Sequence, residues 1–551
     1  MTSPRTPTGT TTGTAVQRTT TTTPWEELVT SALLGTDRRP PAPGPGGREG
    51  PVALLDEAAL RTVRHRAGLL PAEAAERPER APADPRPPLP AAARHRLGHL
   101  LADRSAPSGG SGRRGTAPDL TELLPQWLAS ANRHGFRAPS VLLPALLDAA
   151  RARTDLRAHV LGFAGPRGLW LAAMNPEWKF ALRGAPGGSL PSDTTDPDAA
   201  RRLWEEGLFA ERVALLVAVR RREPAAALAL LSTTWSTERA EDRLMFVDSL
   251  RTGLSGADEG FLEEALTDRS RNVRATAAEL LSALPGSALA ERMAARAVSC
   301  VNPDRTGGAA SIAVEAPHEC DASMQRDGIV PVPPAGRGER SWWLGQLVEA
   351  TPLAIWRDRF GGRSAQEIVG LPVADGWTEE LHAAWCRAAV RQRDPEWARA
   401  LLGTPSTPPA NGPGTASLAE RAKLLATLPG AERAVWVADF IAAHGLSEAF
   451  QLLGVCAVPW AEPLGRSVVD ALDIARDAGS YPWSFSGVMG LAERCLDPAE
   501  ADRLEVLTAT PDEPEGAAPG AGGYWSEAFQ RLVSTLRLRS AMERELTPGA
   551  P

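Results

Sequence analysis

Apolar residues recur at helical spacing between positions 271 and 284. Steps of three and four residues place them on one face of a helix, and they are Val273, Ala277, Leu280, Leu281 and Leu284. Ser270 stands where an N-cap belongs, and Pro285 with Gly286 ends the helical pattern. This stretch therefore predicts an amphipathic helix with one buried face.

A second, shorter apolar stripe precedes this helix at 261–266. The polar turn 267–272 separates the two stripes, so together they predict a helical hairpin. Corresponding helices begin near 224 and 258, and again near 239 and 271, which gives a repeat in the low thirties of residues. A helix pair of this kind buries its apolar face only by stacking on the next pair. We therefore predict an all-α fold, arranged as an α-solenoid of stacked hairpins.

Strand signals are scarce, with one exception at 311–334. There, S-I-A-V-E and G-I-V-P-V-P-P are compatible with a short β-hairpin or an extended, irregular insertion beside the repeats. We expect this segment to interrupt the helical pattern without changing the fold class.

Glycine- and proline-rich stretches separate the helical segments and mark linkers. The predicted order is a disordered Thr-rich leader (1–23), an N-terminal helical region (24–104), a flexible linker (105–118), a helical array (119–300), an irregular insertion (301–340), a helical continuation (341–402), a second linker (403–416) and a C-terminal helical array (417–546).

The stretch F-L-E-E-A-L-T-D-R-S-R-N-V-R-A-T-A-A-E-L-L-S-A-L-P (261–285) resembles a HEAT repeat in its turn Asp, its Val-Arg pair and its Ala-Ala stripe. In HEAT proteins the turn Asp and the Arg of the second helix typically form a ladder of hydrogen bonds between neighbouring repeats. The resemblance assigns these positions to Asp268 and Arg274. The pairs at 207–235 and 417–444 match the repeat only in pattern.

Three further segments resemble a family of uncharacterised bacterial proteins classed as a domain of unknown function. They are W-E-E-L-V-T-S-A-L-L-G-T-D-R-R (25–39), N-P-E-W-K-F-A-L (175–182) and D-G-I-V-P-V-P-P (327–334). Members are often encoded beside a SWIM zinc-finger protein, a MoxR-type AAA ATPase and a von Willebrand A-domain protein. The resemblance brings no known activity. It implies a role in an ATPase-linked assembly, with the ATPase or the A-domain protein as a partner.

The charge balance argues against nucleic acid or lipid as the main partner. The net charge is −7, and the isoelectric point is near 5.8, so the surface is not built to condense on phosphates. Five cysteines without a C-x-x-C pair indicate reduced thiols. No run is long and apolar enough for a membrane span, and the Thr-rich leader lacks a signal-peptide pattern, so we expect a cytoplasmic protein.

Enzyme classes with local sequence signatures are excluded. The chain has two lysines, Lys179 and Lys423, and neither lies in the Gly-rich loop that cradles phosphates. It also lacks G-x-S-x-G, H-E-x-x-H and a dinucleotide-binding G-x-G-x-x-G between strand and helix. No catalytic residue is assigned, and a non-enzymatic role is favoured.

Two histidine-containing patterns are candidate metal ligands. His95, His99 and Asp103 follow one another at four-residue steps, but Asp103 is too far along a straight helix to share one ion with His95. His318 and Cys320 have no second Cys/His pair nearby. We therefore expect no metal and no cofactor.

Tryptophan and arginine supply the candidate partner-binding residues. Trp342 and Trp343 are adjacent and so lie on different helix faces, which would leave one exposed as an interface anchor. Trp483, beside Tyr481, is a weaker candidate of the same kind. The run Arg220, Arg221 and Arg222 reads either as charge complementing a helix C-terminus or as a docking patch for an acidic partner.

Most other tryptophans fall on apolar stripes, where a large ring fills the space between stacked helices. They are Trp127, Trp204, Trp235, Trp385, Trp436 and Trp525. We interpret them as core residues.

Two functions follow from these patterns. The favoured one is a non-enzymatic scaffold or adaptor, because a curved helical array offers a long surface for partner proteins. The alternative is a DNA-binding protein similar to the HEAT-like alkylpurine DNA glycosylases, which grip damaged DNA in a basic groove with tryptophans and an acidic residue. Abundant tryptophan and the arginine run suit this alternative, whereas the acidic balance opposes it.

Overall fold

The computed structural model describes residues 25–41, 47–67, 80–103, 117–184, 197–304, 310–409, 417–510 and 519–547. The chain divides into two compact units, Met1–Arg80 and Ala81–Pro551. This boundary falls inside the N-terminal helical region expected at 24–104. The expected leader (1–23) and most of the expected linker at 105–118 lie outside the described residues.

Unit 1 is a helical hairpin. Its two helices are α1 (Trp25–Leu34) and α2 (Gly50–Ala67), which pack on each other. The acidic residues Glu26 and Glu27 lie in the first turn of α1, where negative charge favours the helix dipole. Arg64 and Arg66 lie in the last turn of α2.

Unit 2 is almost entirely helical, which confirms the all-α prediction. Its first helices are α3 (Ala91–Asp103), α4 (Leu120–Arg133), α5 (Leu143–Ala152), α6 (Arg157–Met174) and α7 (Lys179–Gly184). The next group comprises α8 (Pro197–Glu206), α9 (Phe209–Arg222), α10 (Pro224–Thr234), α11 (Ala240–Ser249), α12 (Glu259–Ala265), α13 (Arg271–Ser282) and α14 (Ala288–Cys300).

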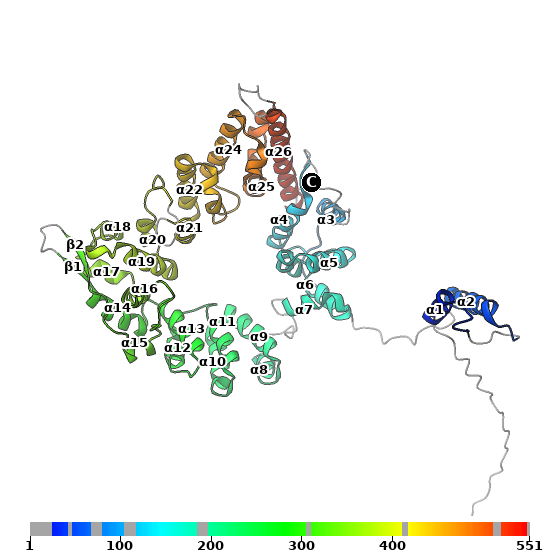
Figure 1. Cartoon of the computed structure of the whole chain (residues 1–551), viewed down its shortest axis with the longest axis horizontal. Helices are drawn as coiled ribbons and strands as arrows, with labels where there is room; N and C mark the ends of the chain where they lie inside the picture. Colours follow the sequence, from blue (N-terminus) through cyan, green and yellow to red (C-terminus); the bar gives the residue numbers. More distant parts are fainter. Residues whose placement is uncertain are drawn as a thin grey trace, which may run out of the picture. The chain divides into compact units, whose positions relative to one another are not determined.

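The remaining helices of unit 2 follow a short β-hairpin. They are α15 (Ala322–Arg326), α16 (Glu339–Ala350), α17 (Ala354–Arg359), α18 (Ala365–Val369), α19 (Thr378–Gln392), α20 (Pro395–Leu402), α21 (Leu418–Thr427), α22 (Gly430–His444), α23 (Leu446–Leu453), α24 (Glu462–Asp477), α25 (Ser486–Cys495) and α26 (Ala521–Leu546). From α8 to α25, each helix packs mainly on helices one to three places away in the chain. Figure 1 shows them following one another along a curved course.

Helix α13 illustrates how the sequence pattern specifies this packing. Its apolar stripe is buried, as predicted, with Val273, Ala277 and Leu281 fully shielded from solvent. Ser270 is the N-cap residue, but its side chain does not cap the helix. Instead the Ser270 amide donates to the Asp268 carboxylate at 2.7 Å, so the turn and the helix start are fixed together.

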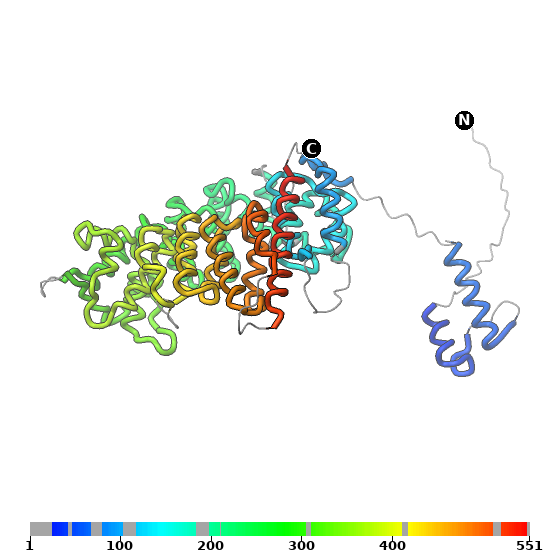
Figure 2. Tube along the Cα trace, turned by 90° about the horizontal axis from the view of Figure 1, so that it is seen from above, coloured from blue at the N-terminus to red at the C-terminus, as the bar shows by residue number. Residues whose placement is uncertain are grey.

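The apolar core of unit 2 falls into two large clusters that meet at α26. One cluster runs from Ala200 to Leu536. The other spans Leu89–Ala164 and also contains Met542 and Leu546 from the end of α26. Helix α26 therefore packs on α24 and α25 with one part and on α3 and α4 with another. Both views show α26 beside this early part of unit 2 (Figures 1 and 2).

The β-hairpin in the insertion pairs different strands from those suggested by the sequence. Strand β2 (Ser311–Val314) pairs antiparallel with β1 (Val301–Asp304), which follows α14 directly. The G-I-V-P-V-P-P segment forms no strand. It packs along α16 instead, because Ile329 is buried and the Val330 amide donates to Gln346 Oε1 at 2.8 Å.

Candidate binding surfaces

Arg220 is a buried structural residue and not a docking residue. Its guanidinium forms two hydrogen bonds to the Asp258 carboxylate, at 2.6 and 3.0 Å, and is fully shielded from solvent. Three further hydrogen bonds reach the carbonyls of Thr252, Pro224 and Leu250. Position 220 thus faces the connection between α11 and α12, which the charge run alone did not reveal.

Arg221 and Arg222 are exposed, unlike Arg220. Arg222 lies at the rim of a small apolar groove of about 360 Å³ between α8, α9 and α10, whose walls include Trp204, Val219 and Leu230. The predicted docking run is therefore reduced to two arginines, one of them beside an apolar groove.

The turn aspartate of the HEAT-like segment contacts a different arginine from the expected one. Asp268 accepts hydrogen bonds from Arg243 of α11, at 2.7 and 3.0 Å. Arg274 donates to the carbonyls of Asp268 and Arg269 within its own turn. The contact that links neighbouring hairpins is therefore Arg243–Asp268, and Arg274 stabilises the local turn.

Arginines bind backbone carbonyls throughout unit 2, which gives the arginine excess a structural role. Arg433 donates to the carbonyls of Ala426, Leu428 and Val455, and Arg539 donates to two more at the end of α25. Arg421 is buried and donates hydrogen bonds to the carbonyls of Thr407 and Pro408. A guanidinium suits this task because its five donors spread in a plane and can serve several carbonyls at once.

Trp342 and Trp343 bind the 329–331 segment of the insertion, and neither side chain is exposed as the predicted interface anchor. The Trp342 indole donates to the Val330 carbonyl and the Trp343 indole to the Pro331 carbonyl, both at 2.8 Å. Trp343 is buried, and Trp342 is partly buried against the core. They lie on different faces of α16 as expected, but the 329–331 segment covers both. The other tryptophans interpreted as core are buried or partly buried.

A polar cavity in unit 2, which we call the charged pocket, has a volume of about 810 Å³. It is formed by α13, α16, α19 and α21, which lie on the inner side of the curve in Figure 1. Its charged lining comprises Arg251, Glu279, Glu349, Arg387, Arg391, Arg393, Glu420 and Lys423. Cations thus outnumber carboxylates on its walls.

Most of these charges are paired across neighbouring helices. Arg251 forms two hydrogen bonds of 2.8 Å to Glu279, and these bonds hold the pKa of the Glu279 carboxyl below its ordinary value. Glu349 of α16 accepts hydrogen bonds from Arg387 and Arg391 of α19. One set of pairs therefore links the end of α11 to α13, and the other links α16 to α19.

Arg393 differs from the other cations of the charged pocket. It is exposed and has no ion-pair partner among the described residues. It ends α19 with a left-handed backbone conformation, φ 53°, which non-glycine residues seldom adopt. Lys423 binds Glu420 at 2.9 Å but is itself largely exposed. The excess positive charge of the charged pocket is therefore accessible at Arg393 and Lys423.

A second exposed surface is an aromatic cluster made by Tyr481, Trp483 and Tyr524. Trp483 stacks on Tyr481 with ring centroids 4.0 Å apart and meets Tyr524 edge-on at 5.2 Å. Its side chain is 54% exposed. The weaker tryptophan candidate from the sequence is thus the one that reaches solvent, and it unites both tyrosines of the chain.

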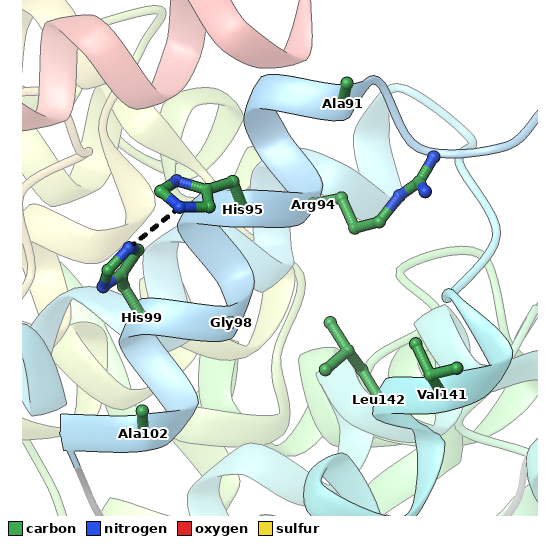
Figure 3. Close-up of a pocket in the computed structure, with 8 residues that line it drawn as sticks. All are labelled: Ala91, Arg94, His95, Gly98, His99, Ala102, Val141 and Leu142. Atoms are coloured by element: carbon green, nitrogen blue, oxygen red, sulfur yellow. Dashed lines mark hydrogen bonds between the residues drawn. The ribbon is translucent and has the colours of Figure 1, made fainter.

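The histidine pair of α3 forms a contact of its own. His95 and His99 Nε2 atoms lie 3.2 Å apart, at hydrogen-bond distance. Figure 3 shows both rings on one side of α3, away from Val141 and Leu142, which line the same pocket of about 440 Å³. The Asp103 side chain lies outside the described residues. His318 is paired with Glu315 and not with Cys320.

The described residues include no group of three or more His, Cys, Asp or Glu side chains arranged to hold a metal ion. The thiols are also poorly suited to nucleophilic chemistry, since burial raises the pKa of Cys386 to about 12 and that of Cys456 to about 11. These two cysteines serve as small apolar core residues.

Within the described parts of the chain, every helix is too short or too polar to cross a bilayer. No curated protein and no solved structure matches the sequence. A family of unknown function, DUF5691, matches residues 27–546. This span includes the 175–182 and 327–334 segments and most of 25–39, the three segments that carried the resemblance. The chain therefore belongs to the DUF5691 family.

Proposed function

We propose that this protein is a non-enzymatic scaffold whose unit 2 is an α-solenoid of HEAT-like hairpins that binds an extended segment of a partner protein. The packing of each helix on its near neighbours in the chain supports the solenoid. The Arg243–Asp268 contact between successive hairpins supports the HEAT-like character.

The charged pocket is the observation that carries the proposal. Its walls come from four helices along the inner side of the array, so a partner that fills it must extend across several hairpins. Side chains of both signs suit a polypeptide, which offers carboxylates, amides and carbonyls together. The accessible cations Arg393 and Lys423 favour an acidic segment at one end of the contact.

Duplex DNA fits this surface less well. Arg251, Arg387 and Arg391 are already hydrogen-bonded to Glu279 and Glu349. A phosphate backbone would have to compete with these carboxylates and would meet their negative charge. We therefore favour a protein partner over nucleic acid. Binding to duplex DNA that falls steeply with salt would reverse this preference.

We further propose that the partner belongs to an ATPase-linked assembly. A MoxR-type AAA ATPase or a von Willebrand A-domain protein encoded nearby is the first candidate. The test is co-expression of each candidate with the full chain, followed by affinity purification and measurement of stoichiometry. A stoichiometric complex is expected, and a chain that purifies alone with every candidate would count against the assembly.

Site-specific photocrosslinking tests where the partner binds. A photoreactive amino acid replaces Val390, which lines the charged pocket, and, as a matched control, Val506, which is exposed elsewhere. We expect a crosslinked partner from position 390 and little from 506. Equal crosslinking at both positions would contradict a specific role for the charged pocket.

Charge reversal supplies an independent measurement. Arg393→Glu with Lys423→Glu should weaken partner binding at least tenfold, because it inverts the accessible charge of the pocket. Arg466→Glu is the control, since Arg466 is exposed on α24, away from the pocket lining, and pairs with its helix neighbour Glu462. Binding that survives the double reversal would place the partner on another surface.

A further inference from the structure

Helix α3 presents two exposed histidines, His95 and His99, one helical turn apart. The four-residue spacing brings both imidazoles to the same side of the helix (Figure 3). The opposite side is anchored, since Ala93, Leu97 and Leu100 are fully shielded from solvent and α3 packs on α4, α5 and α26. The two histidines therefore extend from a helix whose position is fixed, and both rings are open to ions in solution.

The separation of the two rings suits one shared metal ion. The Nε2 atoms of His95 and His99 lie 3.2 Å apart. Zinc binds an imidazole nitrogen at about 2.0–2.1 Å. Two such ligands lie about 3.3–3.4 Å apart at a tetrahedral angle and about 2.9 Å apart at a right angle. The observed separation falls between these values, so both nitrogens can reach one ion with little rearrangement.

The same separation fits a hydrogen bond between neutral rings, in which one Nε2 carries a proton and the other accepts it. A shared ion requires a lone pair on both Nε2 atoms, so each ring then carries its proton on Nδ1. Only the donor ring changes its tautomer, and no proton leaves the pair. Because both rings are exposed, their hydrogen bond competes with water and contributes little net free energy. Metal binding therefore displaces a weak contact.

Two arginines next to the histidines in sequence direct their charge elsewhere. The Arg96 guanidinium donates two hydrogen bonds to the Glu545 carboxylate, at 2.6 and 3.2 Å, and this carboxylate balances its charge. The Arg94 side chain extends away from both imidazoles in Figure 3. Repulsion of a cation held between the two Nε2 atoms is therefore weaker than these sequence neighbours alone suggest.

The chemistry of the two donors selects the kind of ion. Neutral imidazole nitrogen suits Zn²⁺, Cu²⁺ and Ni²⁺, whereas Mg²⁺ and Ca²⁺ prefer oxygen ligands. Two protein ligands leave at least two positions of a tetrahedral ion open for water or another ligand. Both histidines line the pocket of about 440 Å³, whose other walls include Val141 and Leu142. An ion held by both Nε2 atoms would lie at the wall of this pocket.

We propose that His95 and His99 together bind one divalent transition-metal ion such as Zn²⁺ through their Nε2 atoms, with water in the remaining positions. Asp103, the third member of the sequence pattern, is not required. Once one imidazole binds the ion, the second binds it within the same helix, so the pair holds it far more tightly than either ring alone. The site is independent of the charged pocket, and its failure would leave the scaffold proposal intact.

The first test titrates Zn²⁺ into the metal-free full chain by isothermal titration calorimetry, with the thiols kept reduced. We expect saturable binding by the wild type and at least tenfold weaker binding by both His95→Gln and His99→Gln. His318→Gln is the control, because His318 is exposed and contacts Glu315, and it should bind zinc as the wild type does. The proposal is overturned if the wild type binds no zinc, if both variants keep its affinity, or if the control loses as much affinity as they do.

The second test identifies the ligands of the ion. X-ray absorption at the zinc edge, recorded on the full chain with one equivalent of Zn²⁺, should show two imidazole rings together with oxygen ligands at about 2.0–2.1 Å. Sulfur at about 2.3 Å would place the ion on cysteine and would contradict the proposal. Circular dichroism checks that each variant keeps its helices, which we expect because the substituted side chains are exposed.

Discussion

Arg96 of α3 donates a hydrogen bond of 2.6 Å to Glu545 of α26, a residue 449 positions further along the chain. The contact lies beside Leu546, whose side chain is buried among residues of the early helices. Helix α26 thereby closes the apolar cluster at Leu89–Ala164. Helix α26 is therefore part of the apolar core of the first helices of unit 2.

The buried side chain of Leu546 should contribute more to the free energy of unfolding than the Arg96–Glu545 ion pair. Leu546→Ala should lower the free energy of unfolding by about 2–5 kcal/mol, the range for a buried leucine. Glu545→Gln should cost about 1 kcal/mol or less, because the pair is partly exposed to solvent. Urea denaturation followed by circular dichroism measures both. A larger loss for Glu545→Gln than for Leu546→Ala would contradict the assignment.

The buried Arg220–Asp258 pair should be costly to break. Asp258→Asn leaves the Arg220 guanidinium without its anion in a site closed to water, so we expect a loss of about 3–5 kcal/mol in unfolding free energy. Arg221→Ala, one position away and exposed, should change stability by about 0.5 kcal/mol or less. Equal losses of unfolding free energy in the two variants would show that the buried Arg220–Asp258 pair does not stabilise the fold more than an exposed arginine does.

Acid should destabilise the contact between α14 and the insertion. Burial tends to raise the pKa of Asp327, but hydrogen bonds from Arg292 and Arg296 outweigh it and hold that pKa below its ordinary value. A depressed pKa in the folded state means that this stability is present above the unfolded-state pKa, about 3.9. It is lost as the pH falls through the lower folded-state value.

The measurement for Asp327 is the free energy of unfolding from pH 6 to pH 3. We expect a fall below about pH 4, and a smaller fall in Asp327→Asn, which cannot titrate at this position. The variant will be less stable than the wild type at pH 6. An unchanged pH profile in Asp327→Asn would assign the acid sensitivity to other carboxylates.

The two tryptophans of α16 should control access to the insertion. Trp343→Phe keeps an aromatic ring but removes the indole donor that holds the Pro331 carbonyl, at a cost of about 1–3 kcal/mol for the unsatisfied group. We expect faster tryptic cleavage after Arg337. Trp483→Phe, an exposed aromatic elsewhere, is the control. Identical cleavage rates in the two variants would exclude this anchoring role.

Local structure followed from the sequence because its causes are local. The stripe of α13 specified its own buried face, and the turn at 267–272 marked where the chain reverses. The partner of Asp268 did not follow, because side-chain geometry alone decides whether Arg243 or Arg274 reaches it. The same holds for Arg220, which a charge run cannot distinguish from its exposed neighbours.

These sequence patterns could not predict contacts between residues that lie far apart in the chain. The charged pocket brings together Arg251 and Lys423, which lie 172 positions apart in the sequence, and no spacing rule connects positions so far apart. The strand partner of Ser311–Val314 was missed for a related reason. Val301–Asp304 contains a proline and lacks the alternation that usually identifies a strand.

The place of α26 has a consequence for how the protein is made. A ribosome adding about 5–20 residues per second needs roughly 20–90 seconds to travel from Arg96 to Glu545. During that time α3 and α4 exist without the surface that Met542 and Leu546 later supply. The earliest helices of unit 2 therefore complete their fold only after α26 has been synthesised, and a chain that is released before α26 keeps an open apolar seam for chaperones and proteases to recognise.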